Sequence, residues 1–572
     1  MNSLPPVGRR AFLGSGAALA ASAGLLPAWA RPVSHGLATS SQTVLSGTDI
    51  RMTVADSRFA VGGRTGHAVT INGTLPAPLV RLKEGQDVRI TVDNHLDEDT
   101  SIHWHGLIVP FEMDGVPGIS FPGIRPRSSF TYQFPIRQSG TYWYHSHSGL
   151  QEQSGHYGPI IIDPAGPDPI ASDREHVVVL SDWTFLHPHA LFTRLKQEGG
   201  FFNRNKRTMA NKGADPLSAE DARMFAAMRM DPTDISDVTA AAYTYLVNGH
   251  GPGENWTGLF RPGERVRLRV INAAAQTVFN LRIPGLKLTI VATDGIPVRP
   301  VDVDELQIGN AETYDLIVVP EDKAYTLIAE GIDRSGMGIA TLAPRAGMRA
   351  EVPPLRKRPT LTMKDMGMGG MGGMDHSAHG GSPAAQMDHD MRDKSKVGFQ
   401  VGPGVDMIAP MPTDRTGEPG IGLDDVGHRA MTYKDLVALA PNADTRAPTR
   451  RIDIHLTGNM ERFMWSMDGE KLSENPEPYR FARGERVRLR LINDTMMTHP
   501  MHLHGHFFEI VNGHGSHQPL KHTVRVLPGS FVDLDFTADA PGDWAFHCHM
   551  LYHMHAGMMR VVSVRPLDGG KA

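Results

Sequence analysis

Alternation of apolar and polar residues recurs three times along the chain, in segments that closely resemble one another. Residues 85–94 read Gly-Gln-Asp-Val-Arg-Ile-Thr-Val-Asp-Asn, and two later segments repeat this pattern before a final asparagine. The later copies are residues 263–272 and 484–493. Successive side chains point to opposite faces of a strand, so each segment is predicted to be a strand with one buried face.

Short strands separated by Gly/Pro turns surround each copy of the repeat. Strands of this length and spacing are typical of β-sandwiches and small barrels. We therefore predict an all-β chain with three consecutive sandwich domains, at residues 43–165, 172–345 and 431–567.

Two segments fall outside these domains. Residues 1–30 contain Arg9-Arg10, a small-residue apolar run and an Ala-x-Ala cleavage signal at 28–30, which predict a twin-arginine export signal and a periplasmic location. Residues 346–430 lack strand periodicity and are rich in Met, His and Gly, which predicts a flexible linker. No later stretch is apolar enough to span a membrane.

The amino-acid composition limits which partners, disulfides and metal ions can be expected. The net charge of −5 gives no basic excess, so we expect no nucleic-acid partner. The chain has 29 Met and 28 His but a single cysteine, Cys548, which excludes an intrachain disulfide. Thioether and imidazole donors in this abundance favour copper over hard cations.

Histidine pairs stand at matching positions in the first and third repeats. His-x-His begins nine residues after Asn94 and nine after Asn493, whereas the corresponding residues of the middle repeat are Leu281 and Ile283. A second pair in each outer domain begins five residues after Gly140 and Gly542. The four pairs are His103 and His105, His145 and His147, His502 and His504, and His547 and His549. Eight imidazoles from two related domains suit three metal ions, with two ligands for one and three for each of the others.

The last pair encloses the cysteine, in the order His547-Cys548-His549-x3-His553-x4-Met558. A thiolate, two imidazoles and a weak thioether form the ligand set of a blue-copper electron-transfer site. Cys548, His553 and Met558 supply three of these ligands, and His499, three residues before His502, supplies the second imidazole. Alternation along a strand directs Cys548 to one face and its two neighbours to the other.

These motifs resemble the four copper motifs of the multicopper oxidases. The resemblance implies three cupredoxin-like Greek-key domains, four copper ions and four one-electron oxidations coupled to reduction of O2 to two waters. It also implies the ligand assignments, which follow as one set. Type 1 copper takes His499, Cys548, His553 and Met558; type 2 takes His103 and His502; one type 3 ion takes His105, His145 and His549, and the other takes His147, His504 and His547.

The resemblance also bears on the catalytic residues. Cys548 joins the electron-entry site covalently to His547 and His549. Asp114 occupies the position where related enzymes place an acid near the cluster, although it also fits a solvated loop residue. Some relatives have a second carboxylate between the last histidine and the methionine, where this chain has Met554 and His555.

Methionines concentrate in the segment between the second and third domains. Clustered thioethers with Asp and His suit capture of Cu(I), and a plain linker is the alternative. The candidate ligands are Met363, Met366, Met368, Met371, Met374, Met387 and Met391. Six more methionines flank the predicted type 1 ligands and suggest a Cu(I) docking surface: Met496, Met497, Met501, Met550, Met554 and Met559.

Together, the export signal, three domains and the Met-rich segment resemble the CopA-type copper-resistance oxidases. That resemblance implies oxidation of Cu(I) by O2 in the periplasm. We also expect a monomer, with periplasmic copper-handling proteins as partners. A laccase acting on phenolic reductants and a copper-sequestering protein are the alternatives. Histidines 95, 156, 187, 189, 514, 517 and 522 receive no role, and most are expected at the surface.

Overall fold

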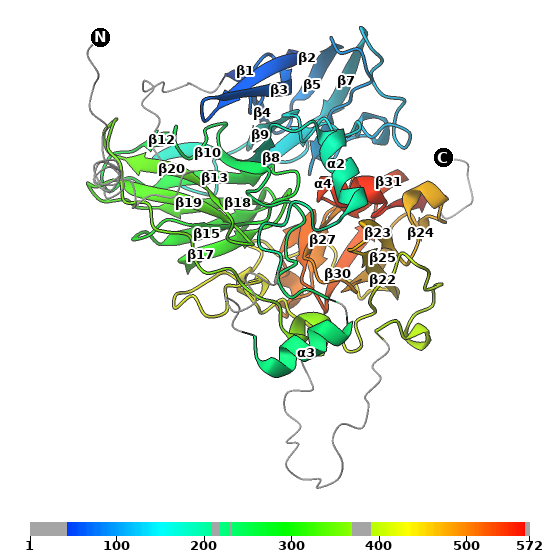
Figure 1. Cartoon of the computed structure of the whole chain (residues 1–572). Helices are drawn as coiled ribbons and strands as arrows, with labels where there is room; N and C mark the ends of the chain where they lie inside the picture. Colours follow the sequence, from blue (N-terminus) through cyan, green and yellow to red (C-terminus); the bar gives the residue numbers. More distant parts are fainter. Residues whose placement is uncertain (1–42, 208–216, 229, 369–390, 567–572) are drawn as a thin grey trace, which may run out of the picture.

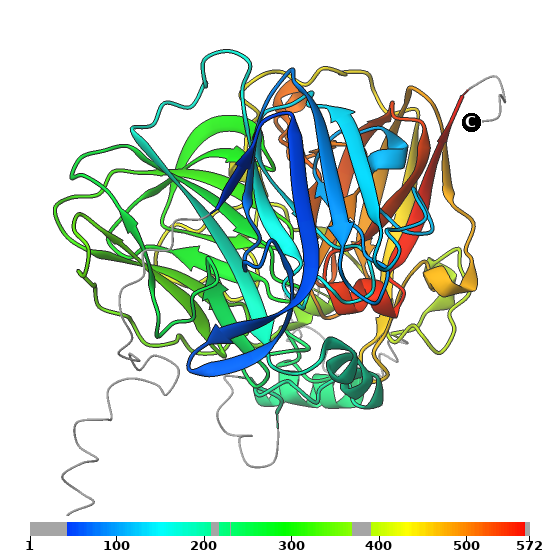
Figure 2. The ribbon, with the colours of Figure 1, turned by 90° about the horizontal axis from the view of Figure 1, so that it is seen from above.

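The computed structural model describes residues 43–207, 217–228, 230–368 and 391–566. Strands dominate these residues and form six sheets, two in each of three successive regions. The all-β sandwich architecture is therefore confirmed. The first region (blue to cyan) lies over the boundary between the second (green) and the third (orange to red) (Figures 1 and 2).

The first sandwich combines a five-stranded and a four-stranded sheet. Their orders are β1-β4-β9-β8-β6 and β3-β2-β5-β7. The strands are β1 Val44–Ser46, β2 Asp49–Val61, β3 Arg64–Ile71, β4 Leu79–Lys83, β5 Asp87–Asn94, β6 His103–His105, β7 Ser129–Pro135, β8 Gly140–His145 and β9 Tyr157–Asp163.

The second sandwich has the orders β11-β10-β13-β18-β15-β16 and β12-β20-β19-β14-β17. Its strands are β10 Arg174–Thr184, β11 Tyr243–Val247, β12 Trp256–Leu259, β13 Val266–Asn272, β14 Phe279–Arg282, β15 Leu288–Thr293, β16 Ile296–Val303, β17 Glu305–Ile308, β18 Thr313–Val318, β19 Tyr325–Gly331 and β20 Met337–Ala343. Two helices, α2 (Pro188–Gln197) and α3 (Ala219–Met228), lie between β10 and β11.

The third sandwich has the orders β23-β22-β25-β30-β27-β28, with β21 also paired to β30, and β24-β32-β31-β26-β29. Its strands are β21 Thr413–Asp414, β22 Arg450–Asn459, β23 Met464–Met467, β24 Tyr479–Ala482, β25 Glu485–Asn493, β26 His499–Leu503, β27 Phe508–Ile510, β28 Leu520–Lys521, β29 Thr523–Val526, β30 Ser530–Ala538, β31 Gly542–Cys548 and β32 Met559–Arg565. A short helix, α4 (Leu551–Ala556), separates β31 from β32.

The three repeated segments occupy the same place in each sandwich. β5, β13 and β25 each pair in parallel with one long strand and antiparallel with another. Their final residues, Asn94, Asn272 and Asn493, are fully buried, and each side-chain amide donates to two or more backbone carbonyls of nearby loops. In the third domain one acceptor is the carbonyl of Met497, two residues before β26. The repeated asparagine thus fixes the loop that leads to the histidine pair.

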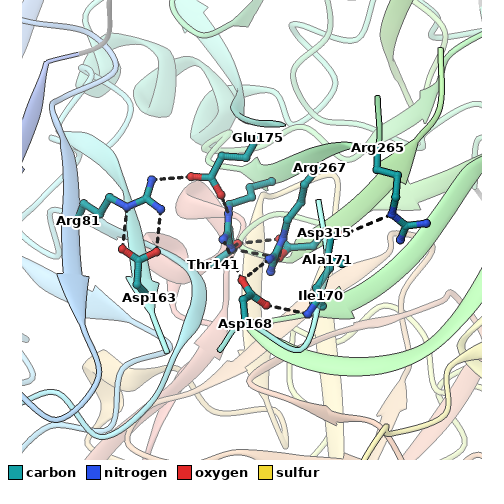
Figure 3. A network of polar contacts seen from close by, with 11 residues as sticks. Arg81, Thr141, Asp163, Asp168, Ile170, Ala171, Glu175, Arg265, Arg267 and Asp315 are labelled. Atoms are coloured by element: carbon teal, nitrogen blue, oxygen red, sulfur yellow. Dashed lines mark hydrogen bonds and ion pairs between the residues drawn. The ribbon is translucent and has the colours of Figure 1, made fainter. Parts of the chain in front are cut away.

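Ion pairs join the sandwiches. Between the first and second, the half-buried Arg81 of β4 bonds to Asp163 and Glu175 (Figure 3), and Glu175 in turn accepts from the buried Arg269. Between the second and third, the Lys521 ammonium lies 3.0 Å from Asp294 and 3.2 Å from Glu312, with all three side chains excluded from solvent. Buried charges of this kind require their partners, so they fix how the domains pack.

The described part of the 346–430 segment differs from the flexible linker that composition predicts. Arg356 forms ion pairs with Glu305 and Glu330 of the second domain, and Met366 is fully buried in the main hydrophobic cluster. Enough apolar side chains and charges are present here to pack this segment onto the folded domains. Among the residues that the structure describes, no helix has the length and apolarity needed to cross a membrane.

Candidate copper centres

A buried pocket in the third domain collects one thiol and two imidazoles. Cys548 ends β31, His499 begins β26 and His553 lies in α4. The Cys548 Sγ is 3.6 Å from Nδ1 of His499 and 3.8 Å from Nδ1 of His553, and the two Nδ1 atoms are 3.3 Å apart. Met558, directly before β32, is fully buried, and its carbonyl accepts from the backbone N–H of Cys548. The structure therefore brings a thiol and two imidazoles to metal-binding spacing, with a thioether residue close by.

The outward nitrogens of these two histidines have partners of their own. Nε2 of His499 lies 2.7 Å from the Thr495 hydroxyl, and Nε2 of His553 lies 2.7 Å from a carboxylate oxygen of Asp237. Trp465 stacks on His553 with ring centroids 3.9 Å apart. Hydrogen bonds at the far nitrogen fix the tautomer of a ligating histidine, so the Nδ1 atoms are free to face the thiol.

Eight further histidines meet where the first and third domains touch. In the strand pairing, His103 of β6 stands opposite His145 of β8, and His502 of β26 stands opposite His547 of β31. Contacts across the domain boundary complete the group: Nε2 of His147 is 3.3 Å from Nε2 of His547. Within this group, three trios of histidines each have one ring nitrogen per residue within 4.8 Å of the others. The trios are His103, His105 and His145; His103, His502 and His504; and His147, His504 and His547.

Cys548 stands between the thiol pocket and this cluster. It is preceded in β31 by His547, whose Nε2 lies 3.0 Å from Nε2 of His504, and is followed directly after the strand by His549, whose Nε2 lies 3.4 Å from Nε2 of His145. One short peptide segment therefore belongs to both sites, as alternation along a strand requires.

Several histidines of the cluster are oriented by a hydrogen bond at the Nδ1 atom of the ring. Nδ1 of His504 donates to the Asp114 carboxylate at 2.9 Å, and Nδ1 of His103 donates to the Asp114 backbone carbonyl at 2.8 Å. His145 Nδ1 is 2.7 Å from the Glu152 carboxylate, with both side chains buried. Asp114 is thus a buried partner of two cluster histidines, rather than a solvated loop residue.

Several buried nitrogens in the cluster lack a hydrogen-bond partner. They are Nε2 of His103, Nδ1 of His105, Nε2 of His502 and Nδ1 of His549. Leaving buried polar atoms unsatisfied is costly, which indicates that another group binds them. Burial and neighbouring imidazoles lower the pKa of His105, His145, His147, His502, His504 and His549 well below the usual value. Neutral imidazole is the form that binds metals, so the donor set fits copper ions.

Three buried residues near these sites received no role in the sequence interpretation. Asp237 comes from the second domain, Glu152 from the loop after β8, and His522 from the end of β28, where its carbonyl holds Nδ1 of His502 at 2.7 Å. His522 is 1% exposed, contrary to the expected surface position, and its Nε2 has no partner. No repeat or motif marks these residues: Asp237 reaches His553 from another domain, and Glu152 and His522 are positioned by the conformation of loops.

Most of the predicted Cu(I)-binding methionines that the structure describes are not at the surface. Met366 and Met368 are buried, while Met363 and Met391 are half-buried. Met371, Met374 and Met387 lie outside the described residues. The six methionines near the thiol pocket also face inward: Met496, Met497, Met501, Met550 and Met559 are buried, and Met554 is half-buried. Their packing in apolar clusters explains this burial and does not provide a docking surface.

Comparison with known proteins gives one consistent result. Multicopper oxidase family models match residues 53–166, 174–346 and 445–568. Copper resistance protein A of Escherichia coli is 48% identical over 97% of this chain and 99% of its own length. The multicopper oxidase MmcO of Mycobacterium tuberculosis is 31% identical over 96% and 95%. The crystal structure of Fet3p, a multicopper oxidase that functions in iron import, superposes with a TM-score of 0.64 at 20% identity, covering 92% of this chain and 91% of that one.

Proposed function

The chain belongs to the multicopper oxidase family, and we propose that it oxidises Cu(I) to Cu(II) with O2 as electron acceptor, as part of copper resistance. The observation that supports this most strongly is the His547-Cys548-His549 segment, which belongs to both buried sites. Four Cu(I) ions would give up one electron each, and one O2 with four protons would become two water molecules. The similarity to a copper resistance protein favours Cu(I) over phenols as the reductant.

The ligand assignment of this proposal follows the two clusters. Type 1 copper is assigned to His499, Cys548, His553 and Met558; type 2 copper to His103 and His502; the type 3 pair to His105, His145 and His549 and to His147, His504 and His547. When bound, these four coppers supply one-electron acceptors and the centre at which O2 is reduced.

The protein's own residues prepare these sites. The Cys548 backbone and side chain connect the thiol pocket to His547 and His549 through covalent bonds. Asp114 accepts the Nδ1 proton of His504 and thereby directs Nε2 of that ring into the cluster. Glu152 does the same for His145. Burial, with a smaller effect from Asp182, raises the pKa of Glu152 well above its usual value.

The proposal also places the protein in the periplasm, because the Arg9-Arg10 pair, the apolar run and the Ala-x-Ala site within residues 1–30 are typical of a twin-arginine signal. That segment lies outside the described residues. In the same way, Met371, Met374 and Met387 are proposed to collect Cu(I) for the enzyme.

O2 uptake by the fully copper-loaded protein tests this function, with Cu(I) and then 2,6-dimethoxyphenol as reductant. We expect rapid uptake with Cu(I), and none with either reductant in a Cys548→Ser variant. Uptake with the phenol alone would establish a laccase instead. No uptake with either reductant, together with binding of many more than four coppers per chain, would establish a copper-sequestering protein. A variant lacking residues 369–390 should lose Cu(I) oxidation preferentially if that stretch collects the ion.

A further inference from the structure

The proposed substrate must reach the type 1 site from solvent, yet the ligands of that site are enclosed. His499, Cys548, His553 and Met558 are all fully buried. The neighbouring methionines are buried or half-buried, so they offer little to an arriving ion. Beside the type 1 site, an exposed donor for Cu(I) therefore has to be sought among the imidazoles.

Helix α4 provides such a donor two residues after the type 1 ligand His553. Residues two apart on a helix point to nearly opposite sides, since each residue turns the helix by about 100°. His553 accordingly faces the buried thiol, whereas His555 is exposed. A charge at His555 is therefore separated from the type 1 site by only a short stretch of one helix.

Helix α2 of the second domain lies beside α4 (Figure 1), and two histidines, His187 and His189, stand at its start. Phe192 of α2 stacks on Tyr552 of α4 with ring centroids 6.2 Å apart, and contacts His555 edge-on at 4.8 Å. This packing sets the start of α2 beside His555. The His189 ring centroid lies 6.3 Å from that of His555 and 5.5 Å from that of His187, and all three histidines are exposed.

These separations are close to those of rings that share a metal ion. A metal–nitrogen bond of about 2.0 Å places two imidazoles on one ion about 5 to 6 Å apart between centroids. The pair assigned to type 1 copper, His499 and His553, shows 5.1 Å. The exposed pair of His189 and His555 is somewhat wider, and rotation of exposed side chains is enough to close the difference.

We propose that His189 and His555, with His187 beside them, form the docking site at which Cu(I) delivers its electron. This inference rests on the proposed function, because it names where the substrate of that reaction binds. Imidazole is a suitable ligand for copper. Each docked Cu(I) is oxidised to Cu(II) and released, its electron passes along α4 to the type 1 site, and O2 with protons from water is the final acceptor. The site lies between the second and third domains, so it exists only when α2 and α4 are packed together.

The test compares two reductants on fully copper-loaded protein. In His189→Ala, His555→Ala and the double variant, kcat/KM is measured by O2 uptake with Cu(I) and with 2,6-dimethoxyphenol. We expect the ratio of the Cu(I) value to the phenol value to fall by at least about tenfold in the double variant. Compared with His189→Ala, His189→Met should keep more of the wild-type ratio, because a thioether also binds Cu(I). His95→Ala, which removes an exposed histidine of the first domain, is the matched control and should leave the ratio unchanged.

A direct measurement locates the ion. Ag(I) has the charge and softness of Cu(I) but does not give up an electron, so a crystal soaked in Ag(I) should show anomalous density between the rings of His189 and His555. An unchanged ratio in the double variant, or an equal fall with both reductants, would overturn the docking site. Absence of silver between the two rings would overturn it as well. Failure of the wild-type protein to oxidise Cu(I) would instead refute the proposed function itself.

Discussion

Asp237 offers a sharp test of how the second domain tunes the type 1 site. Its carboxylate lies 2.7 Å from Nε2 of His553, is 3% exposed, and also accepts from the Gln276 amide at 2.8 Å. In Asp237→Asn the amide keeps the size of the side chain but removes the negative charge. The lost interaction stabilised the more positive, oxidised site, so the reduction potential of type 1 copper should rise.

The size of the change follows from the strength of this contact. Loss of a partner behind a metal-bound histidine typically costs about 10 to 100-fold in metal affinity. If this loss falls on Cu(II) alone, each tenfold corresponds to about 59 mV for a one-electron couple. We therefore expect an increase of about 60 to 120 mV, measured by redox titration of the blue absorption band.

A pH series strengthens the test. Burial raises the pKa of Asp237 to about 7 in the metal-free site, and the charge of bound copper lowers it from there. The ionised carboxylate favours oxidised copper, so the wild-type potential should fall as pH rises through this pKa, while the Asn variant should lack this step. Asp234→Asn is the control, because burial also raises the pKa of Asp234 to about 7 but its carboxylate bonds to Asn203. Equal potentials for wild type and Asp237→Asn would refute the reasoning.

Three further changes test other parts of the structure. Asp114→Ala removes the acceptor for Nδ1 of His504 and should lower O2 reduction about 10 to 100-fold, which the reoxidation rate of the reduced protein measures; a change below twofold contradicts this role. Glu152→Gln should weaken the hydrogen bond to Nδ1 of His145 and alter the type 3 absorption without altering the blue band. Identical spectra for the variant and the wild type would contradict this role of Glu152. Lys521→Met removes the ammonium shared by the buried carboxylates of Asp294 and Glu312; Arg525 still pairs with Glu312, but Asp294 loses its buried lysine partner. The variant should destabilise the copper-free protein by about 3 to 5 kcal/mol, and an unchanged urea midpoint would argue against that.

Local patterns in the sequence were enough to determine the fold class. Alternation in β5, β13 and β25 predicted strands, and the structure places all three at the same position of a sandwich. Repetition also separated the outer domains, which have histidine pairs, from the middle domain, which has Leu281 and Ile283 instead. These conclusions needed only short-range regularities, because strand periodicity and motif spacing are properties of neighbouring residues.

Tertiary structure alone decided which residues support these motifs. Asp237 stands beside His553 only because the second domain packs against the third, whereas Glu152 and His522 reach their histidines through the folding of loops within one domain. The burial of individual side chains could not be predicted from the sequence either. Met366 packs in the core, although the composition of the surrounding segment predicted a flexible linker. The proximity of His189 to His555 likewise depends on α2 packing against α4 across two domains. A sequence pattern specifies which face of an element is apolar, but which distant element covers that face is settled only when the whole chain has packed.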